Sequence, residues 1–162
     1  MALETIASLG IISDTHGLIR PAALDALRGA DRIVHAGDIG DPAVLDALQA
    51  IAPVIAVRGN NDRGAWARRL PARTTFEAGG AKIHVIHDRA EIAASALEGG
   101  VALVVSGHSH RPSVSTESGI VFLNPGSAGP RRFHLPISVA RCEIKQGRVT
   151  ARLVDLDGEI VE

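Results

Sequence analysis

The sequence is poor in cysteine and in aromatic residues. It contains one cysteine, Cys142, three phenylalanines, one tryptophan and no tyrosine. A single cysteine excludes an internal disulfide framework and is typical of a reducing compartment, so we expect a cytoplasmic protein in which Cys142 fills apolar space in a strand. So few aromatic side chains provide no evident base-stacking platform, and single-stranded nucleic acid is therefore not an expected partner.

Net charge and long apolar runs are also lacking. Lysine and arginine total 17 against 18 aspartates and glutamates, which gives a formal net charge of −1. No global field therefore favours nucleic acid or an anionic membrane surface. The chain has no apolar run of transmembrane length and no basic segment followed by an apolar one near its start, so we expect no membrane association. Residues 1–162 have the length of one domain with a buried core.

Apolar, β-branched runs alternate with short helical patterns over the first two thirds of the chain. These patterns predict strands over residues 10–14, 32–36, 53–57, 74–76, 82–86 and 101–106, helices over 21–27, 42–50 and 90–97, and a polar loop over 58–71. Alternating runs in the final third predict antiparallel strands over 114–117, 120–123, 137–144 and 149–155. We therefore expect an α/β fold with two mixed β-sheets packed face to face and helices outside.

Polar side chains with metal-binding chemistry follow these strand-like runs, at turns or beside glycines. They are Asp14, His16, Asp38, Asn60, His87, His108 and His110. The carboxyl ends of parallel strands meet at one edge of an open α/β sheet, so we expect the seven side chains to converge there. Seven ligands are too many for one tetrahedral zinc ion and about right for two ions that share a bridging ligand.

The mixture of donor atoms indicates which ions and which substrate to expect. Oxygen ligands combined with four imidazoles suit manganese, iron, nickel or zinc, with manganese the first choice, whereas oxygen ligands alone would favour magnesium or calcium. Two divalent ions, two carboxylates and a bridging hydroxide leave a net charge of about +1 at the site. A positive pocket that carries a nucleophile attracts an anion, and a small phosphate ester is the substrate that fits.

Five short motifs that contain these residues occur in a fixed order. They are Asp14-Thr15-His16, Gly37-Asp38, Gly59-Asn60-Asn61-Asp62, His87-Asp88 and Gly107-His108-Ser109-His110, followed by Asn124-Pro125-Gly126-Ser127. In this order the chain resembles the calcineurin-like metallophosphoesterase superfamily over residues 8–145, and in particular its small single-domain prokaryotic phosphodiesterase branch. The resemblance implies a four-layer α/β/β/α sandwich and a binuclear metal-dependent phosphodiesterase that uses a metal-bridging hydroxide for in-line attack on phosphorus.

The resemblance also implies how the ligands divide between the ions. It places Asp14, His16 and His110 on one ion, Asn60, His87 and His108 on the other, and Asp38 between both. Two positions depart from the family pattern. Asn61 stands where many phosphatases of the superfamily have a histidine that protonates the leaving group, and Asp88 replaces the glycine that usually follows His87. Without the acid at position 61, substrates with good leaving groups are favoured, and Asn61 and Asp62 are the candidate catalytic residues beside the ligands.

Several of these residues also have a structural interpretation. Asp14 and His16 could cap the helix that follows them, and His87 could be a solvated loop histidine. Asp62 could hold a turn, or it could orient His16 or His110. Three further histidines are expected to be structural, although His35 could hydrogen-bond a metal ligand: His35, His84 and His134. Six loop arginines are expected to be solvated surface residues, although they could face a phosphate: Arg58, Arg63, Arg68, Arg69, Arg131 and Arg132.

Two alternative functions stay open on the same residues. One is a phosphomonoesterase or nucleotide phosphatase that uses the same ions. The other is a non-catalytic protein-binding scaffold, as in the retromer subunit that resembles this family, although all seven ligand positions are filled here. The alternating C-terminal strands could also leave a sheet edge that pairs with a second copy, so we expect a homodimer.

Overall fold

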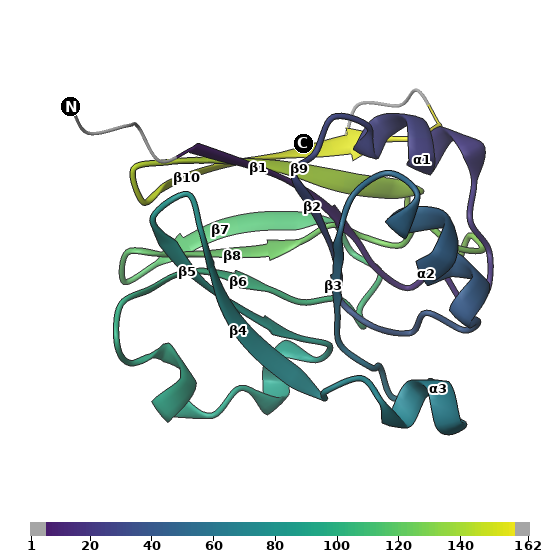
Figure 1. Ribbon diagram of the computed structural model, residues 1–162, viewed down its shortest axis with the longest axis horizontal. Coiled ribbons are helices and arrows are strands. Elements are labelled where there is room, and N and C mark those ends of the chain that lie inside the picture. Colours follow the sequence, from purple (N-terminus) through teal and green to yellow (C-terminus); the bar gives the residue numbers. More distant parts are fainter. Residues whose placement is uncertain (1–5, 158–162) are drawn as a thin grey trace.

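The computed structural model describes residues 6–157. In this part of the chain ten strands form two mixed sheets of five strands each (Figure 1). The first sheet has the order β10-β9-β1-β2-β3 and the second the order β4-β5-β6-β8-β7. The expectation of two mixed sheets is therefore confirmed.

The first sheet combines parallel and antiparallel strands. Strands β1, β2 and β3 run parallel, β9 lies antiparallel to β1, and β10 forms a hairpin with β9. Their bounds are β1 (Ile6–Ile12), β2 (Arg32–His35), β3 (Val54–Ala56), β9 (Ser138–Lys145) and β10 (Arg148–Asp155).

The second sheet has three parallel strands at its centre and an antiparallel strand at each edge. Strand β4 lies antiparallel to β5, whereas β5, β6 and β8 run parallel. The bounds are β4 (Arg73–Ala78), β5 (Ala81–Ile86), β6 (Val101–Val105), β7 (Ser113–Glu117) and β8 (Ile120–Asn124). The antiparallel strands expected in the last third are present, since β7 pairs with β8 and β9 with β10, but β8 also pairs parallel with β6, which was not predicted. Strand β8, which is apolar and largely buried, pairs with β6 inside the sheet. Every residue of β7 is exposed, and β7 forms the edge of the sheet.

The two sheets pack face to face through branched aliphatic side chains. Leu9 and Ile11 of the first sheet and Ile83 and Leu103 of the second are fully buried in one cluster. Cys142 lies in the same cluster, and burial raises the pKa of its thiol to about 12. The thiol therefore stays neutral and fills apolar space, as expected.

Helices cover the outer face of the first sheet. They are α1 (Pro21–Leu27) and α2 (Pro42–Gln49), whose buried leucines and valine pack in one cluster with Ile12 and Ile33 of the sheet. At the start of α2 the Asp41 carboxylate accepts a hydrogen bond of 2.8 Å from the Ala43 backbone N–H. None of the described helices is long and apolar enough to cross a membrane.

The outer face of the second sheet carries only short turns. The expected helix over residues 90–97 is wrong: the segment forms two 3₁₀ turns, η1 (Arg89–Glu91) and η2 (Ala94–Leu97), because Ile92 and Ala93 between them have extended backbone angles. Ile92 and Leu97 still pack against this sheet. The expected loop over residues 58–71 also contains one helical turn, α3 (Ala65–Arg68), which buries Ala67.

Candidate metal centre

The predicted ligands leave the carboxyl ends of five strands that belong to both sheets. Asp14 and His16 follow β1, Asp38 follows β2, Asn60 follows β3, His87 follows β5, and His108 and His110 follow β6. The Asp14 N–H donates to the Gly37 carbonyl (3.0 Å) and joins two loops of the first sheet, while the His108 N–H donates to the Asp14 carboxylate (3.1 Å) and joins the second sheet to the first. The strand ends thus bring residues that are far apart in the sequence to one place.

Five of the seven predicted ligands form two overlapping groups. The ligand atoms of Asp14, His16 and His110 lie within 4.8 Å of one another, and so do those of Asp14, Asp38 and His87. Asp14 Oδ1 is 3.4 Å from His110 Nε2 and 3.9 Å from His87 Nε2. Asp38 Oδ2 is 3.5 Å from His87 Nε2 and 3.9 Å from His16 Nε2. Both carboxylates therefore lie between the two sets of imidazoles.

Three buried atoms of these residues have no hydrogen-bond partner in the described structure: Asp14 Oδ1, His87 Nε2 and His110 Nδ1. The first two lie 3.9 Å apart. A buried carboxylate oxygen or imidazole nitrogen without a partner costs free energy, and a cation placed between them would satisfy both. The residues present therefore fit divalent ions.

The two carboxylates are held in their charged form. Burial alone would raise the pKa of Asp38, but the nearby His87 and two hydrogen bonds from Asn61 hold it well below its usual range. These bonds, both 2.9 Å, come from the Asn61 backbone N–H and side-chain amide. Burial likewise opposes the charge of Asp14, but His110 and the Ser13 hydroxyl, 2.7 Å from Asp14 Oδ2, lower its pKa. Both side chains can therefore bind a cation at neutral pH.

A backbone carbonyl fixes the orientation of His87. Its Nδ1 lies 2.8 Å from the Ala36 carbonyl oxygen, which can only accept a hydrogen bond. Nδ1 must therefore carry a proton, and Nε2 is the nitrogen that faces Asp14 and Asp38. Burial opposes a charge on the ring, but these two carboxylates raise the pKa of His87, so a cation bound at Nε2 would replace the proton there. The side chain is 6 % exposed, so the interpretation of His87 as a solvated loop histidine is wrong.

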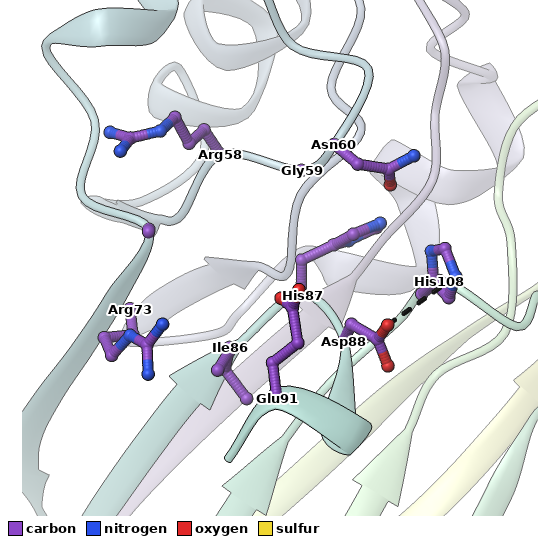
Figure 2. A pocket seen from close by; sticks show the side chains of 10 residues that line it. Arg58, Gly59, Asn60, Arg73, Ile86, His87, Asp88, Glu91 and His108 are labelled. Carbon is purple, nitrogen blue, oxygen red and sulfur yellow. Dashed lines mark ion pairs between the residues drawn. The ribbon is translucent and has the colours of Figure 1, made fainter. Parts of the chain in front are cut away.

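Asn60 and His108 are exposed at the rim of the site, and His108 belongs to neither close group. Together with His87 they line a pocket of about 240 Å³, which Figure 2 shows from close by. His108 Nε2 is 3.8 Å from Asp88 Oδ2, an ion pair marked in Figure 2. Asp88 thus replaces the usual glycine with a carboxylate that lies beside a predicted ligand. Arg58 and Arg73 line another part of the same pocket.

Asp62 joins two loops and does not orient a histidine. One of its oxygens accepts from the Gly59 (2.8 Å) and Ile39 (3.1 Å) N–H groups, and the other from the Gly40 N–H (2.9 Å). It therefore ties the loop after β2 to the loop after β3. Of the two interpretations left open by the sequence, the structure favours the turn.

His35 contacts residues that are adjacent in sequence to the predicted ligands. It is fully buried, its Nδ1 accepts from the Gly37 N–H (3.1 Å), and its Nε2 lies 3.0 Å from the hydroxyl of Thr15, between Asp14 and His16. Burial lowers its pKa to about 4, so the ring is neutral. His84 and His134 lie apart from this network: His84 Nδ1 contacts the Thr75 hydroxyl at 2.9 Å, and His134 is exposed.

Five of the seven predicted ligands have a left-handed backbone conformation, which the sequence does not reveal. Their φ angles lie between 47° and 72°: Asp14, His16, Asp38, His108 and His110. Positive φ is uncommon outside glycine, and such strain concentrates at functional sites. The sequence also gave no role to the last motif. Asn124 donates to the Gly107 carbonyl (3.0 Å) and Ser127 to the Asp14 carbonyl (2.9 Å), so both hold ligand loops in place.

Comparison with known proteins gives consistent matches. A family model described as the calcineurin-like phosphoesterase superfamily domain matches residues 8–147. The chain is 32 % identical over 169 residues to a probable metallophosphoesterase of Methanocaldococcus jannaschii, and the alignment covers 92 % of this chain and 81 % of the relative. A predicted phosphoesterase of Streptococcus pneumoniae has a similar structure, with a TM-score of 0.70, 27 % identity and coverage of 99 % and 94 %. Vps29 of Chaetomium thermophilum shares the fold, with a TM-score of 0.74, 21 % identity and coverage of 91 % and 97 %.

Proposed function

The chain belongs to the calcineurin-like phosphoesterase superfamily, whose members are metal-dependent phosphoester hydrolases, and on this premise we propose that it hydrolyses phosphodiesters with two divalent ions. The observation that carries the proposal is the pair of overlapping ligand groups around the unpartnered atoms Asp14 Oδ1 and His87 Nε2. Asp14, His16 and His110 would hold one ion, Asn60, His87 and His108 the other, with Asp38 between them. Manganese is the proposed ion because imidazole and oxygen donors are mixed.

Two divalent ions at these ligands would supply the positive charge that holds the phosphate oxygens and the activated water that attacks phosphorus in line. The chain's own contribution is to keep the ligands charged and oriented. Asn61 holds both oxygens of Asp38, and the Ala36 carbonyl fixes the His87 ring. These contacts orient Asp38 and His87 toward the place where an ion would bind.

The preference for diesters rests on the absence of an acid at position 61. The Asn61 amide donates to Asp38 and has no proton to give to a leaving group. The proton must then come from water, from His108 or from His110, or the leaving group must need none. A general acid contributes roughly 10²–10⁴-fold when the leaving group needs a proton, so poor leaving groups should react slowly here.

Three substrates and one variant test the proposal on the manganese-loaded protein. Bis(4-nitrophenyl) phosphate and 4-nitrophenyl phosphate share a leaving group and differ as diester and monoester, while methyl phenyl phosphate has a poorer leaving group. We expect kcat/KM to be highest for the nitrophenyl diester. Asn61→His, which introduces an imidazole beside Asn60, should increase turnover of the methyl phenyl ester more than that of either nitrophenyl ester.

The same measurements discriminate the alternatives. A higher kcat/KM for the monoester would favour a phosphomonoesterase or nucleotide phosphatase. A purified protein that binds no divalent ion and hydrolyses none of the three would favour a protein-binding scaffold.

A further inference from the structure

Phe133 is a backbone outlier that neither the ligands nor the hairpin turns explain. Eight non-glycine residues of the described chain have positive φ. Five are predicted metal ligands, and two, Ser118 and Gln146, precede a glycine in the turns of the β7–β8 and β9–β10 hairpins. The eighth is Phe133, with a φ of 54°. A bulky aromatic residue in this conformation is strained, and such strain persists only where the surrounding structure imposes it.

The Phe133 side chain is also exposed to an unusual degree. It is 88 % exposed, whereas the next most exposed large apolar residue, Ile6, is 51 % exposed. The other two phenylalanines pack against the cores, Phe76 on the inner face and Phe122 on the outer face of the second sheet. Packing therefore gives no reason for a strained aromatic ring at position 133.

The segment that carries Phe133 starts directly at the metal-ligand loop. Gly129 packs so closely on the loop after β1 that a Cβ at this position would lie 2.4 Å from the Asp14 carbonyl oxygen and 2.5 Å from that of Thr15. Arg20 donates a hydrogen bond of 3.2 Å to the Gly129 carbonyl from the other side. The beginning of the segment is therefore fixed against Asp14.

The far end of the segment is fixed as well. Arg131 donates to the Leu135 carbonyl (3.0 Å) and pairs with Asp157, while the Leu135 N–H donates to the Arg132 carbonyl (3.1 Å). These bonds close a turn that projects Arg132 and Phe133. Because Gly129 lies against the Asp14 and Thr15 carbonyls, the turn begins two residues away from the loop that carries Asp14 and His16.

We propose that the turn of residues 131–135 is a substrate-recognition element, in which Phe133 stacks on a planar aromatic or heterocyclic group of the phosphate ester and Arg132 contacts its phosphate. This inference deepens the proposed function and rests on it. The substrate class is then aryl or nucleoside phosphates and their diesters, in preference to purely aliphatic esters. A single aromatic ring can stack on a single base, so the turn suits a mononucleotide rather than a nucleic-acid strand, which would need several stacking side chains.

A pair of ligands that differ in the base alone tests this element through its effect on affinity. Isothermal titration of the manganese-loaded protein would compare thymidine 5′-monophosphate with 2-deoxyribose 5-phosphate. Stacking on one aromatic side chain typically changes affinity about 5- to 100-fold, so we expect the nucleotide to bind more tightly by a factor in this range. Phe133→Ala should reduce that ratio to near 1 and leave the affinity for the sugar phosphate unchanged. Phe133→Trp should retain the ratio.

Further variants separate recognition from folding. Arg132→Ala should weaken both ligands by the same factor, because both carry the phosphate. Phe133→Asn, whose side chain tolerates the left-handed conformation, should lose the ratio without lowering the unfolding temperature. Val114→Ala removes another exposed apolar side chain, on β7, and should change nothing.

Several results would overturn the inference. They are equal affinities for the two ligands in the native protein, no binding of either, or an unchanged ratio in Phe133→Ala. A Phe133→Ala protein that changes from dimer to monomer in light scattering with the ratio unchanged would assign the ring to an interface instead. Hydrolysis of bis(4-nitrophenyl) phosphate, measured in parallel, keeps the two proposals distinct. Hydrolysis without base-dependent binding refutes this inference alone, whereas base-dependent binding without hydrolysis refutes the proposed function.

Discussion

Removing the Asn61 side chain should weaken ion binding, because this amide holds the carboxylate of Asp38, a predicted metal ligand. Asn61 Nδ2 and the Asn61 backbone N–H donate to different oxygens of Asp38, each at 2.9 Å. Both bonds contribute to the low pKa of Asp38. Asn61→Ala removes the first bond and retains the second, so the pKa of Asp38 should rise towards its usual value while the carboxylate loses one restraint on its orientation.

The magnitude follows from the type of bond. A hydrogen bond to a charged group contributes about 1.5–3 kcal/mol, and the exposure of Asn61 favours the lower end. Loss of a group that orients a metal ligand typically costs about 10- to 100-fold in ion affinity. We therefore expect roughly tenfold weaker manganese binding in Asn61→Ala. The pH at which the ion binds should move upward, since a carboxylate with a higher pKa needs a higher pH to lose its proton.

Calorimetric titration of metal-free protein with manganese, at several pH values, measures both effects. Arg63→Ala is the matched control, because it truncates an exposed side chain two positions further along the same loop. Circular dichroism should show the same fold in all three proteins. An Asn61→Ala protein that binds manganese with native affinity and native pH dependence would refute the argument that Asn61 sets the state of Asp38.

Four further outcomes are expected. Asp38→Asn should lose at least one ion and nearly all hydrolysis while circular dichroism shows a folded chain, and retention of half the activity would contradict its place between the ions. EDTA should abolish hydrolysis, and manganese should restore it better than calcium because four imidazoles disfavour a hard oxygen-seeking cation. Burial lowers the pKa of His35 to about 4 in the folded protein, whereas an unfolded histidine has a pKa of about 6.5. As pH falls through this range, the imidazole of the unfolded chain is protonated before that of the folded chain. The free energy of unfolding of metal-free protein should therefore fall as pH drops from about 6.5 to 4. The His35 contribution to that fall is about 3 kcal/mol, and denaturant titrations should show a shallower pH dependence in His35→Asn. Light scattering should give the mass of two chains if the edge of β7 or β10 pairs with a second copy, and a mass near that of one chain would exclude the homodimer.

The parts of the fold predicted well are those with a local physical signal. Asp41 followed by Pro42 predicts the start of a helix, and the structure shows the carboxylate capping α2 there. The β-branched run before Ser106 predicts a strand buried on both faces, and β6 lies at the centre of its sheet. In both cases the residues that favour the element are also those that the tertiary structure uses, so local preference and packing agree.

The errors arose where tertiary contacts decide the conformation. Residues 90–97 have helical composition, but Ile92 and Leu97 both pack on the second sheet and the backbone between the two 3₁₀ turns is extended. The parallel pairing of β8 with β6 depends on where β7 lies, and no local pattern encodes the position of an edge strand. In short segments of this kind the intrinsic helix or strand propensity is too weak to determine the conformation against the tertiary packing of the rest of the chain.

The convergence of the predicted ligands could be anticipated because their motifs contain glycines at points where the loops approach one another closely. A Cβ on Gly59 would lie 2.1 Å from Asp38 Oδ1, and a Cβ on Gly107 would lie 2.1 Å from the Ser13 hydroxyl oxygen. Only glycine fits at either position, so the ligands that follow these glycines carry a recognisable signature in the sequence. Phe133 has no such neighbour, and its strain and exposure are properties of a turn fixed at both ends by contacts distant in sequence. Close approach between loops therefore leaves a glycine signature in the sequence, whereas the strain and exposure of Phe133 can be recognised only in the structure.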